Sequence, residues 1–271
     1  MFTHFLITRF NLPLSGFGPE IIYSPSLDET WLRVRLKYFL QYCVPSVLSQ
    51  STTAFTWLIY LDRSTPEEFR QTLQFSTAQP VPIELVYVKD FDGMLEDLRH
   101  RIRQVTTSHV ITSRIDNDDV IHMKFMETVQ IHFTPASMTL VNFNSGYEYH
   151  VHERIIKKWN ERLHNQFMSL FEDAQAANIL TIYGFPHWQP PGNATFINIS
   201  SPPGWAHIRH ENNYSPDTYK AIPVFTSGAL KTISPVFRDT TFSFYNTMTY
   251  ALRWFPRMIA RRIRTLFVGK N

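Results

Sequence analysis

The sequence predicts an α/β protein with a mostly parallel β-sheet that is covered by helices on both faces. Strand-like and helix-like segments alternate regularly along the first half of the chain, and several of the expected strands end in polar residues. Parallel neighbours need a long crossover, so helical segments between strands indicate βαβ units. With 271 residues, 44% of them hydrophobic, the chain can bury a substantial core.

Each element of this alternation has its own local signal. We expect strands where short apolar runs are bounded by turn residues, and helices where apolar residues recur every three or four positions. Proline at the start of the second helix fits the first turn of a helix. In chain order the expected elements are the strand His4–Phe10, the helix Trp31–Leu48, the strand Thr56–Leu61, the helix Pro66–Phe75, the strand Ile83–Val88, the helix Met94–Val105 and the strand Val110–Ile115.

The pattern is weaker in the second half of the chain. We expect a strand over Met138–Phe143, partly helical structure over 151–178 and a loop region over 186–203, which is rich in proline, glycine and aromatic residues. Stiff loops with aromatic residues suit the apolar faces of sugar rings. For Trp188 and Trp205, however, core packing is an equally good interpretation.

The C-terminal residues 251–271 predict a basic amphipathic helix, separate from a domain over 1–250. Apolar residues fall on one stripe, and no acidic residue follows position 253. Such a helix fits an anionic membrane surface, although a helix docked on the domain would show the same pattern. Nucleic acid is not an expected partner, since no zinc or single-strand-binding motif accompanies the basic residues. They are Arg253, Arg257, Arg261, Arg262, Arg264 and Lys270.

The remaining composition favours a cytoplasmic protein, peripheral on the inner face of the plasma membrane. The N-terminal residues 1–9 lack the basic region and cleavage site of a signal peptide. We find no apolar run near the roughly 20 residues that span a bilayer. The single cysteine, Cys43, excludes an intrachain disulfide and fits a reducing compartment.

A cluster of carboxylates, Asp116, Asp118 and Asp119, follows the fourth expected strand. Carboxylates this close repel one another unless a cation neutralises them, and oxygen ligands suit Mg²⁺ or Mn²⁺ bound to substrate phosphates. Capping of a following helix is an alternative. An EF-hand calcium loop fits poorly, because Val120 and Ile121 replace a polar ligand and the required glycine.

Other polar residues stand at the carboxyl ends of the expected strands. Thr8, Arg9 and Asn11 follow the first strand, Asp62 follows the second, and Arg114 closes the fourth. Ligands of open α/β sheets bind outside these strand ends. Asp62 could instead cap the turn that follows it. Together these residues predict a shared binding site for a nucleotide diphosphate.

The chain resembles the nucleotide-sugar glycosyltransferases of the GT-A fold, and among them most closely the bacterial family described as putative rhamnosyltransferases. The resemblance covers roughly residues 4 to 215, and the segment around Asp116 is its most specific part. The matching segments are Thr8–Asn11, Trp31 with Arg35, Pro45–Gln50, Trp57–Asp62, Thr65–Pro66, Ile111–Asp119 and Ile208–Asn212.

The resemblance assigns roles to the acidic motif, which corresponds to the DXD motif of GT-A enzymes. It implies that Asp116 faces the ribose, that Asp118 binds the metal, and that Asp119 is a second metal ligand or supports the first. Asp62 falls where such enzymes read the nucleotide base. His210 is the histidine that would complete the metal site. The implied cofactor is Mn²⁺ or Mg²⁺.

The expected chemistry is departure of a nucleoside diphosphate from the anomeric carbon. A bound cation together with Arg9 or Arg114 can stabilise the charge that develops on the leaving phosphate. Inversion also needs a carboxylate that takes the acceptor's proton. Glu211 and Asp217 are the candidate bases, with Asp173 as a further possibility.

The leading hypothesis is therefore a transferase that adds a sugar, with rhamnose suggested by the resemblance, to a bacterial surface glycan or lipid-linked acceptor. Residues 1–135 would form the nucleotide-binding half of the domain and 136–250 the acceptor half. A nucleotidyltransferase is an alternative, but Gly16 and Gly18 lack the basic neighbours of its phosphate loop. A noncatalytic glycan-binding or scaffold protein is the other alternative.

Overall fold

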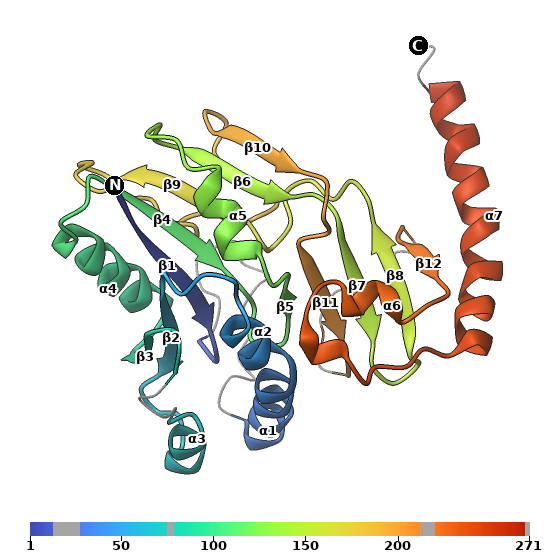
Figure 1. The fold of residues 1–271 in the computed structure, drawn as a ribbon, viewed down its shortest axis with the longest axis horizontal. Helices are drawn as coiled ribbons and strands as arrows, with labels where there is room; N and C mark the ends of the chain where they lie inside the picture. Colours follow the sequence, from blue (N-terminus) through green and yellow to red (C-terminus); the bar gives the residue numbers. More distant parts are fainter. Residues whose placement is uncertain (13–27, 75–78, 212, 214–219, 269–271) are drawn as a thin grey trace.

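The computed structural model describes residues 1–12, 28–74, 79–211, 213 and 220–268, with side chains up to position 260. These residues form two β-sheets and the helices packed around them (Figure 1). The larger sheet has seven strands in the order β10-β6-β9-β4-β1-β2-β3, and the smaller has five in the order β12-β8-β7-β11-β5.

The elements have the following bounds. The seven-stranded sheet contains β1 (Phe2–Arg9), β2 (Thr56–Asp62), β3 (Ile83–Val88), β4 (His109–Arg114), β6 (Thr139–Phe143), β9 (Ser169–Asp173) and β10 (Thr195–Ile199), and the five-stranded sheet contains β5 (Val120–Ile121), β7 (Gly146–His150), β8 (Ile155–Trp159), β11 (Trp205–Arg209) and β12 (Ile222–Val224). The helices are α1 (Glu29–Tyr38), α2 (Val44–Leu48), α3 (Glu67–Thr72), α4 (Phe91–Gln104), α5 (Phe125–Ile131), α6 (Gly228–Lys231) and α7 (Phe244–Val268), with a π-helical turn at Phe39–Cys43 and a 3₁₀ turn at Pro235–Phe237.

The larger sheet is mostly parallel, as the sequence predicts. β1 lies between β2 and β4 and is parallel to both, and β3 continues the parallel order beside β2. β9 runs antiparallel to β4 and β6, and β10 is parallel to β6. The carboxyl ends of β1, β2 and β4 therefore meet at one edge of the sheet.

Each face of this sheet buries its own core, which confirms the expected covering by helices. Leu6, Trp57 and Ile111 belong to a cluster with side chains of α1, α2 and α5. Their neighbours along the strands, such as Ile7 and Leu58, belong to a second cluster with α4. Successive side chains of a strand point to opposite faces, so both faces of these strands are apolar and buried.

The acidic segment 116–119 connects the two sheets. It leaves the carboxyl end of β4 and leads directly into β5, which pairs antiparallel with β11 through Trp205↔Ile121. The segment therefore lies where the larger sheet meets the smaller sheet.

Most expected helices are present with shifted ends. The helix expected over Trp31–Leu48 is α1, the π-helical turn and α2 in succession, and it begins early because Asp28 accepts a hydrogen bond from the backbone N–H of Trp31 at 2.8 Å. Likewise α4 begins at Phe91, since Asp90 caps the N–H of Gly93 at 2.9 Å. Phe75, the expected end of the second helix, lies outside the described residues.

Two predictions for the second half were wrong. The range 151–178, expected to be partly helical, contains β8 and β9, and the expected loop 186–203 contains β10. These strands are five residues each, and their partners lie in other segments of the sheets. Strands this short carry little local signal, because their stability comes from cross-strand pairing.

Helix α7 begins at Phe244, so the expected boundary after position 250 falls inside a continuous helix. Its first turns contact β8 and β12, where the hydroxyl of Tyr250 donates to the carbonyl of Ala221 at 3.1 Å. Figure 1 shows its later turns extending away from the sheets. Within the described part of the chain, no helix is both long and apolar enough to span a membrane.

Candidate functional site

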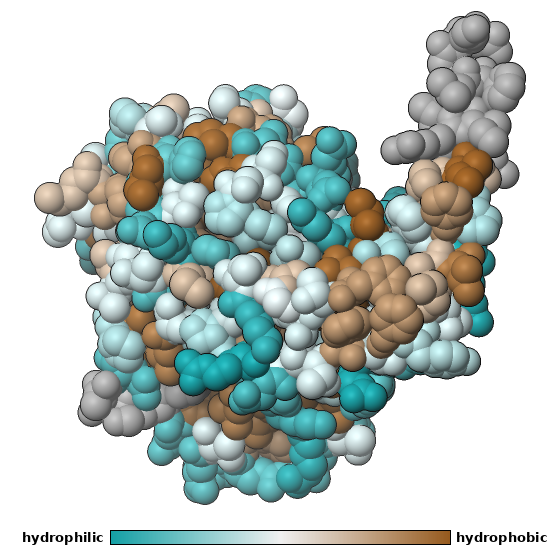
Figure 2. Space-filling view, turned by 45° about the vertical axis from the view of Figure 1, so that its right-hand side comes forward, coloured by the Kyte–Doolittle hydropathy of each residue, from teal (hydrophilic) through white to brown (hydrophobic). Residues whose placement is uncertain are grey.

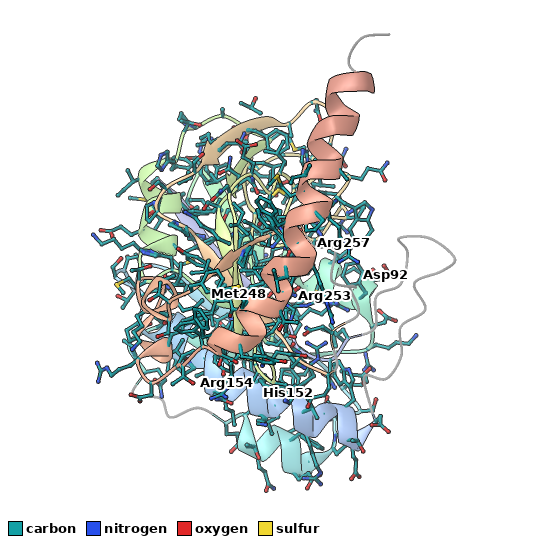
Figure 3. All side chains as sticks on the ribbon, turned by 90° about the vertical axis from the view of Figure 1, so that its right-hand side faces the viewer. Asp92, His152, Arg154, Met248, Arg253 and Arg257 are labelled. Carbon is teal, nitrogen blue, oxygen red and sulfur yellow. The ribbon has the colours of Figure 1, made fainter. Side chains whose placement is uncertain are left out.

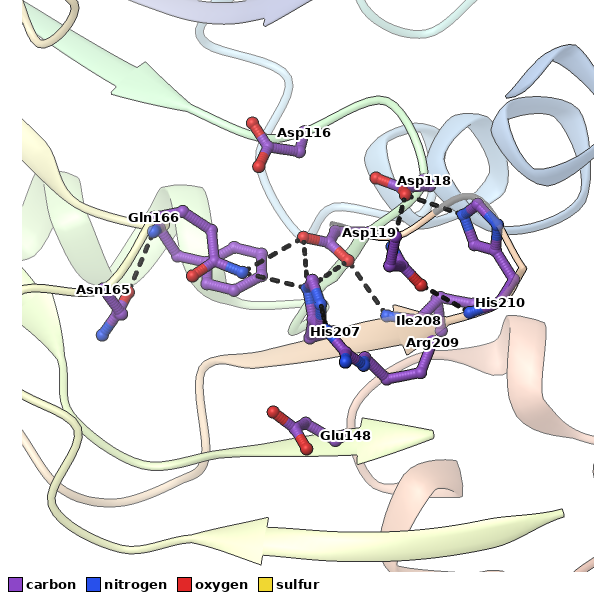
Figure 4. A network of polar contacts seen from close by, with 12 residues as sticks. Asp116, Asp118, Asp119, Glu148, Asn165, Gln166, His207, Ile208, Arg209 and His210 are labelled. Carbon is purple, nitrogen blue, oxygen red and sulfur yellow. Dashed lines mark hydrogen bonds and ion pairs between the residues drawn. The ribbon is translucent and has the colours of Figure 1, made fainter. Parts of the chain in front are cut away.

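Asp118 lies at the centre of the acidic segment and is almost fully buried. One oxygen of its carboxylate, Oδ2, accepts from Nη1 of Arg35 on α1 and from Nδ2 of Asn213 at 3.2 Å. Nε2 of His210, which follows β11, lies 2.8 Å from the same oxygen (Figure 4). The structure thus brings His210 to Asp118 across 92 residues of sequence.

The charge of Asp118 is compensated by these neighbours. Burial alone would raise the pKa of the Asp118 carboxyl, but the Arg35 guanidinium and His210 outweigh burial and hold this pKa well below its usual range. Arg35 is itself fixed, since Nη1 also donates to Oδ1 of Asn117 at 3.2 Å and the guanidinium lies 5.1 Å from the Trp31 ring centre. The result is a buried, ionised pair.

Asp119 joins the acidic segment to β11. Its carboxylate accepts from the backbone N–H of Ile208 at 3.0 Å and lies 3.0 Å from Nδ1 of His207. Burial raises the pKa of Asp119 in spite of His207, whose own pKa is raised because that carboxylate outweighs the effect of burial. The side chain has no exposed surface, so in this conformation its contacts are structural.

Asp116 faces two arginines at the strand ends. Nη2 of Arg114 lies 3.6 Å from Oδ1 of Asp116, and its guanidinium lies 4.7 Å from the ring centre of Tyr183. Burial lowers the pKa of the Arg9 guanidinium, and the charge of Arg114 lowers this pKa further. Tyr183 and Asp116 act on it in the opposite direction. Nε of Arg9 and Nε of Arg114 are buried and have no hydrogen-bond partner among the described residues. Buried donors without partners are the groups that an anionic ligand would satisfy.

Three other predicted ligand residues are engaged in contacts between strand ends. Oγ1 of Thr8 accepts from the indole N–H of Trp57 at 2.9 Å, and Asn11 accepts from the backbone N–H of Asp62 at 3.1 Å. The carboxylate of Asp62 accepts from the backbone N–H of Ser64 at 2.7 Å, so it caps the turn after β2. Nucleotide contacts for Thr8, Asn11 and Asp62 stay predictions.

The predicted metal ligands are Asp118, Asp119 and His210. Their carboxylates and imidazole are suitable ligand types for a divalent ion. However, Oδ2 of Asp118 is already surrounded by Arg35, His210 and Asn213. Among the residues that the structure describes, no three His, Cys, Asp or Glu side chains converge on a position for an ion. This conformation therefore does not fit Mn²⁺ or Mg²⁺, and an ion would have to displace Arg35 from Asp118.

The candidate bases are placed very differently. Oε2 of Glu211 lies 2.7 Å from Nε2 of His152 and accepts from the Tyr38 hydroxyl at 3.3 Å. Asp173 pairs with His109 at the start of β4, roughly 20 Å along the strand from Asp116 at 3.3 Å per residue. Asp217 lies outside the described residues. Glu211 is thus the candidate that the structure places beside His210.

The two alternative interpretations of the acidic segment find no support. Helix α5 begins only at Phe125, after Lys124, and the chain between Asp119 and this helix forms β5. Val120 and Ile121 are fully buried in that strand. The segment therefore neither caps a helix nor forms a calcium loop.

Several residues near the acidic segment were missed by the sequence interpretation. Arg35 matched the family pattern but was given no role, and its spacing of four residues from Trp31 on one helix was the available signal. Nothing local singles out Glu148 or Arg162, which reach this region only through the pairing of the second sheet. Of the two tryptophans considered for sugar binding, Trp205 is fully buried against Phe167, whereas Trp188 is exposed.

A mostly parallel sheet with an acidic motif and arginines at its strand ends defines a nucleotide-sugar transferase of the GT-A type. The family model described as "Putative rhamnosyl transferase" matches residues 3–222, so the chain belongs to that family. It is accordingly a glycosyltransferase, and this family membership favours neither alternative considered above, a nucleotidyltransferase or a noncatalytic scaffold. None of the curated proteins matches the sequence.

Solved structures with a similar arrangement share little sequence with this chain. The Staphylococcus aureus protein TarS, residues 1–349 in complex with UDP-GlcNAc, is 10% identical, with a TM-score of 0.46 over 96% of this chain and 73% of that chain. HddC from Yersinia pseudotuberculosis is 10% identical, with a TM-score of 0.34 over 73% of this chain and 91% of that chain. Similarity at this level carries no information about substrates.

Proposed function

We propose that this glycosyltransferase moves a sugar from a nucleoside diphosphate donor to a bacterial surface glycan, with inversion at the anomeric carbon. The description of its family suggests rhamnose as that sugar. The observation that supports the donor is the pair of arginines beside Asp116. Their buried Nε atoms have no hydrogen-bond partner among the described residues, and the strand ends are where α/β sheets bind ligands. Arginine donors pair well with phosphate oxygens.

The proposed reaction breaks one bond and forms another. The acceptor hydroxyl oxygen attacks the anomeric carbon while the bond from that carbon to the phosphate oxygen breaks. The electron pair leaves with the nucleoside diphosphate, and Arg9 and Arg114 would stabilise the charge that develops there. Electrostatic stabilisation of this kind is usually the largest catalytic contribution.

We assign the proton of the acceptor hydroxyl to Glu211, the candidate carboxylate that lies next to His210. Burial would raise the pKa of Glu211, but His152, backbone contacts and His210 lower it to about 2, so the carboxylate is ionised at neutral pH and is a weaker base than an ordinary glutamate. Asp217 stays a prediction. The cofactor, Mn²⁺ or Mg²⁺, also stays a prediction, because the described conformation does not fit such an ion.

We further propose that α7 attaches the chain to an anionic membrane that carries a lipid-linked acceptor. At 100° per residue, six exposed apolar residues occupy an arc of about 100° on this helix. Figure 2 shows apolar residues gathered along the helix, and Figure 3 shows Met248 on one side of it with Arg253 and Arg257 on the other. Apolar side chains beside arginines suit a bilayer interface. The stripe contains Phe244, Tyr245, Met248, Leu252, Phe255 and Ile259.

The donor assignment can be tested with the purified full chain. We expect at least one member of a panel of UDP-, GDP- and dTDP-sugars to bind in isothermal titration calorimetry and to be hydrolysed slowly to the nucleoside diphosphate. Each titration is run with Mn²⁺ and with EDTA. If no donor binds the folded protein under either condition, the proposed function is wrong.

A further inference from the structure

We infer that a second cluster of polar side chains, built around Glu148 on β7, binds hydroxyl groups of the acceptor sugar. This inference rests on the proposed function and names the acceptor side of the same site. Glu148 lies beside His207 of β11 and Lys157 of β8 in the register of the smaller sheet. Figure 4 shows Glu148 and Asp119 on opposite sides of His207.

Two cationic or polar nitrogens approach Glu148 without reaching it. Nε2 of His150 lies 3.8 Å from Oε2 of the carboxylate, and Nη1 of Arg162 lies 3.9 Å from Oε1. Both separations exceed the 2.7–3.2 Å of an ordinary hydrogen bond, and a further oxygen could bridge each gap. Neither nitrogen has a hydrogen-bond partner among the described residues, although both are buried.

Two more buried atoms of this region also lack partners within the described part of the chain. They are the indole Nε1 of Trp159, which ends β8, and Oε1 of Gln166. Trp159 lies 5.0 Å beneath the Arg162 guanidinium, and the amide nitrogen of Gln166 lies 3.0 Å from His207. Four unsatisfied atoms in neighbouring residues form a group, and such groups call for a ligand or for ordered water.

The mixture of donors and acceptors indicates the chemistry of that ligand. His150, Arg162 and Trp159 offer N–H groups, whereas Glu148 and Gln166 offer oxygens. A sugar hydroxyl both donates and accepts, so it can satisfy members of both sets. The Glu148 carboxylate would repel a phosphate, so this cluster differs in its ligand chemistry from the arginines beside Asp116.

The cluster around Glu148 adjoins the acidic segment. The amide nitrogen of Gln166 lies 3.5 Å from Oδ2 of Asp119. An acceptor hydroxyl held near Glu148 would therefore lie beside the bound donor.

The test uses the indole N–H signal of Trp159 in NMR spectra of full-length protein labelled with ¹⁵N-tryptophan. Six tryptophans give few signals, and Trp159→Phe assigns the one of interest. Methyl α-rhamnoside and methyl α-glucoside are titrated to millimolar concentration, with and without saturating UDP, GDP or dTDP. We expect the Trp159 signal to shift with at least one glycoside, whereas the exposed Trp188 does not respond.

Glu148→Gln should weaken the glycoside affinity measured from the Trp159 signal at least tenfold. Its affinity for nucleoside diphosphate should stay within about twofold of the wild type. Glu96→Gln, on the exposed face of α4, is the matched control and should change neither. The inference is overturned if no glycoside shifts Trp159, as ordered water alone would give, or if Glu148→Gln responds like the wild type. Failure of every nucleoside diphosphate to bind, with a normal glycoside response, would instead contradict only the donor assignment.

Discussion

The two polar regions beside the acidic segment differ in the balance of their charges. At the strand ends of the larger sheet, Arg9 and Arg114 face Asp116 with buried nitrogens that no described residue satisfies. Around Glu148 in the smaller sheet, N–H donors and oxygen acceptors are mixed. The first composition suits phosphate and the second suits hydroxyl groups. We therefore propose that the first region is the donor side and the second the acceptor side.

Acid should act on the two sheets at different pH, and this is the largest effect we expect. Burial lowers the pKa of His4 in β1 from 6.5 to about 3, so the unfolded chain binds a proton below pH 6.5 that the folded chain excludes. Stability is then lost as the pH falls, by about 3 kcal/mol between pH 7 and pH 4. Urea unfolding at several pH values measures this loss, and His4→Gln should remove it. An equal pH dependence in wild type and variant would contradict the assignment.

A second loss of stability should follow at lower pH in the smaller sheet. Burial would raise the pKa of Glu148, but His150 and His207, with further basic neighbours, lower it from 4.5 to about 2. The ionised carboxylate contributes stability that is present above pH 4.5 and is lost as the pH falls from 4.5 to about 2. In the same experiments, Glu148→Gln should flatten the curve below pH 4.5 and leave the part due to His4 unchanged.

The affinity for Mn²⁺ would show whether Arg35 keeps a divalent ion from Asp118 on the donor side. Arg35 contacts the Asp118 oxygen that a bound divalent ion would use, so we expect Arg35→Gln to bind Mn²⁺ at least about tenfold more tightly than the wild type, a change of roughly 1.4 kcal/mol. Titration of the Mn²⁺ electron paramagnetic resonance signal measures the affinity. Arg33→Gln, on the exposed side of α1, is the control. Equal affinities of wild type and Arg35→Gln would show that Arg35 does not compete with the ion.

The smallest expected effect concerns α7, which lies outside both regions. Leu252→Glu places a charge on the exposed apolar stripe and should reduce sedimentation with phosphatidylglycerol vesicles several-fold. Ala260→Glu adds the same charge away from the stripe and should have little effect. If the wild type is a dimer in light scattering, and Leu252→Glu makes it a monomer without changing sedimentation, the stripe is an interface between copies and not a membrane surface.

The sequence predicts the parts of the molecule that depend on interactions between residues close together in the chain. The alternation up to β4 depends on local patterns, so strands β1 to β4 and the position of Asp116 at a strand end were predicted correctly. The smaller sheet depends on pairings such as Trp205↔Ile121, which no local pattern encodes, and the short strands β8, β9 and β10, which belong to both sheets, were misassigned. Short strands with distant partners are the part that residue patterns predict least.

The candidate site divides in the same way. The acidic segment and Arg114 could be predicted because they are contiguous with β4. The approach of His210 to Asp118 was expected only from the family resemblance, and the pairing of Arg35 with Asp118 requires the packing of α1 against the strand ends. The environment of Glu148 depends on three strands meeting, so it was not predicted.

The most direct test of the division into two sides is to measure nucleoside diphosphate affinity in one variant of each. Arg114→Gln removes a phosphate donor and should weaken binding by about 10- to 100-fold, the range of a charged hydrogen bond. Glu148→Gln should leave the affinity within about twofold of the wild type. Equal losses in both variants, or an unchanged affinity in Arg114→Gln, would contradict the assignment of the donor to the arginines beside Asp116.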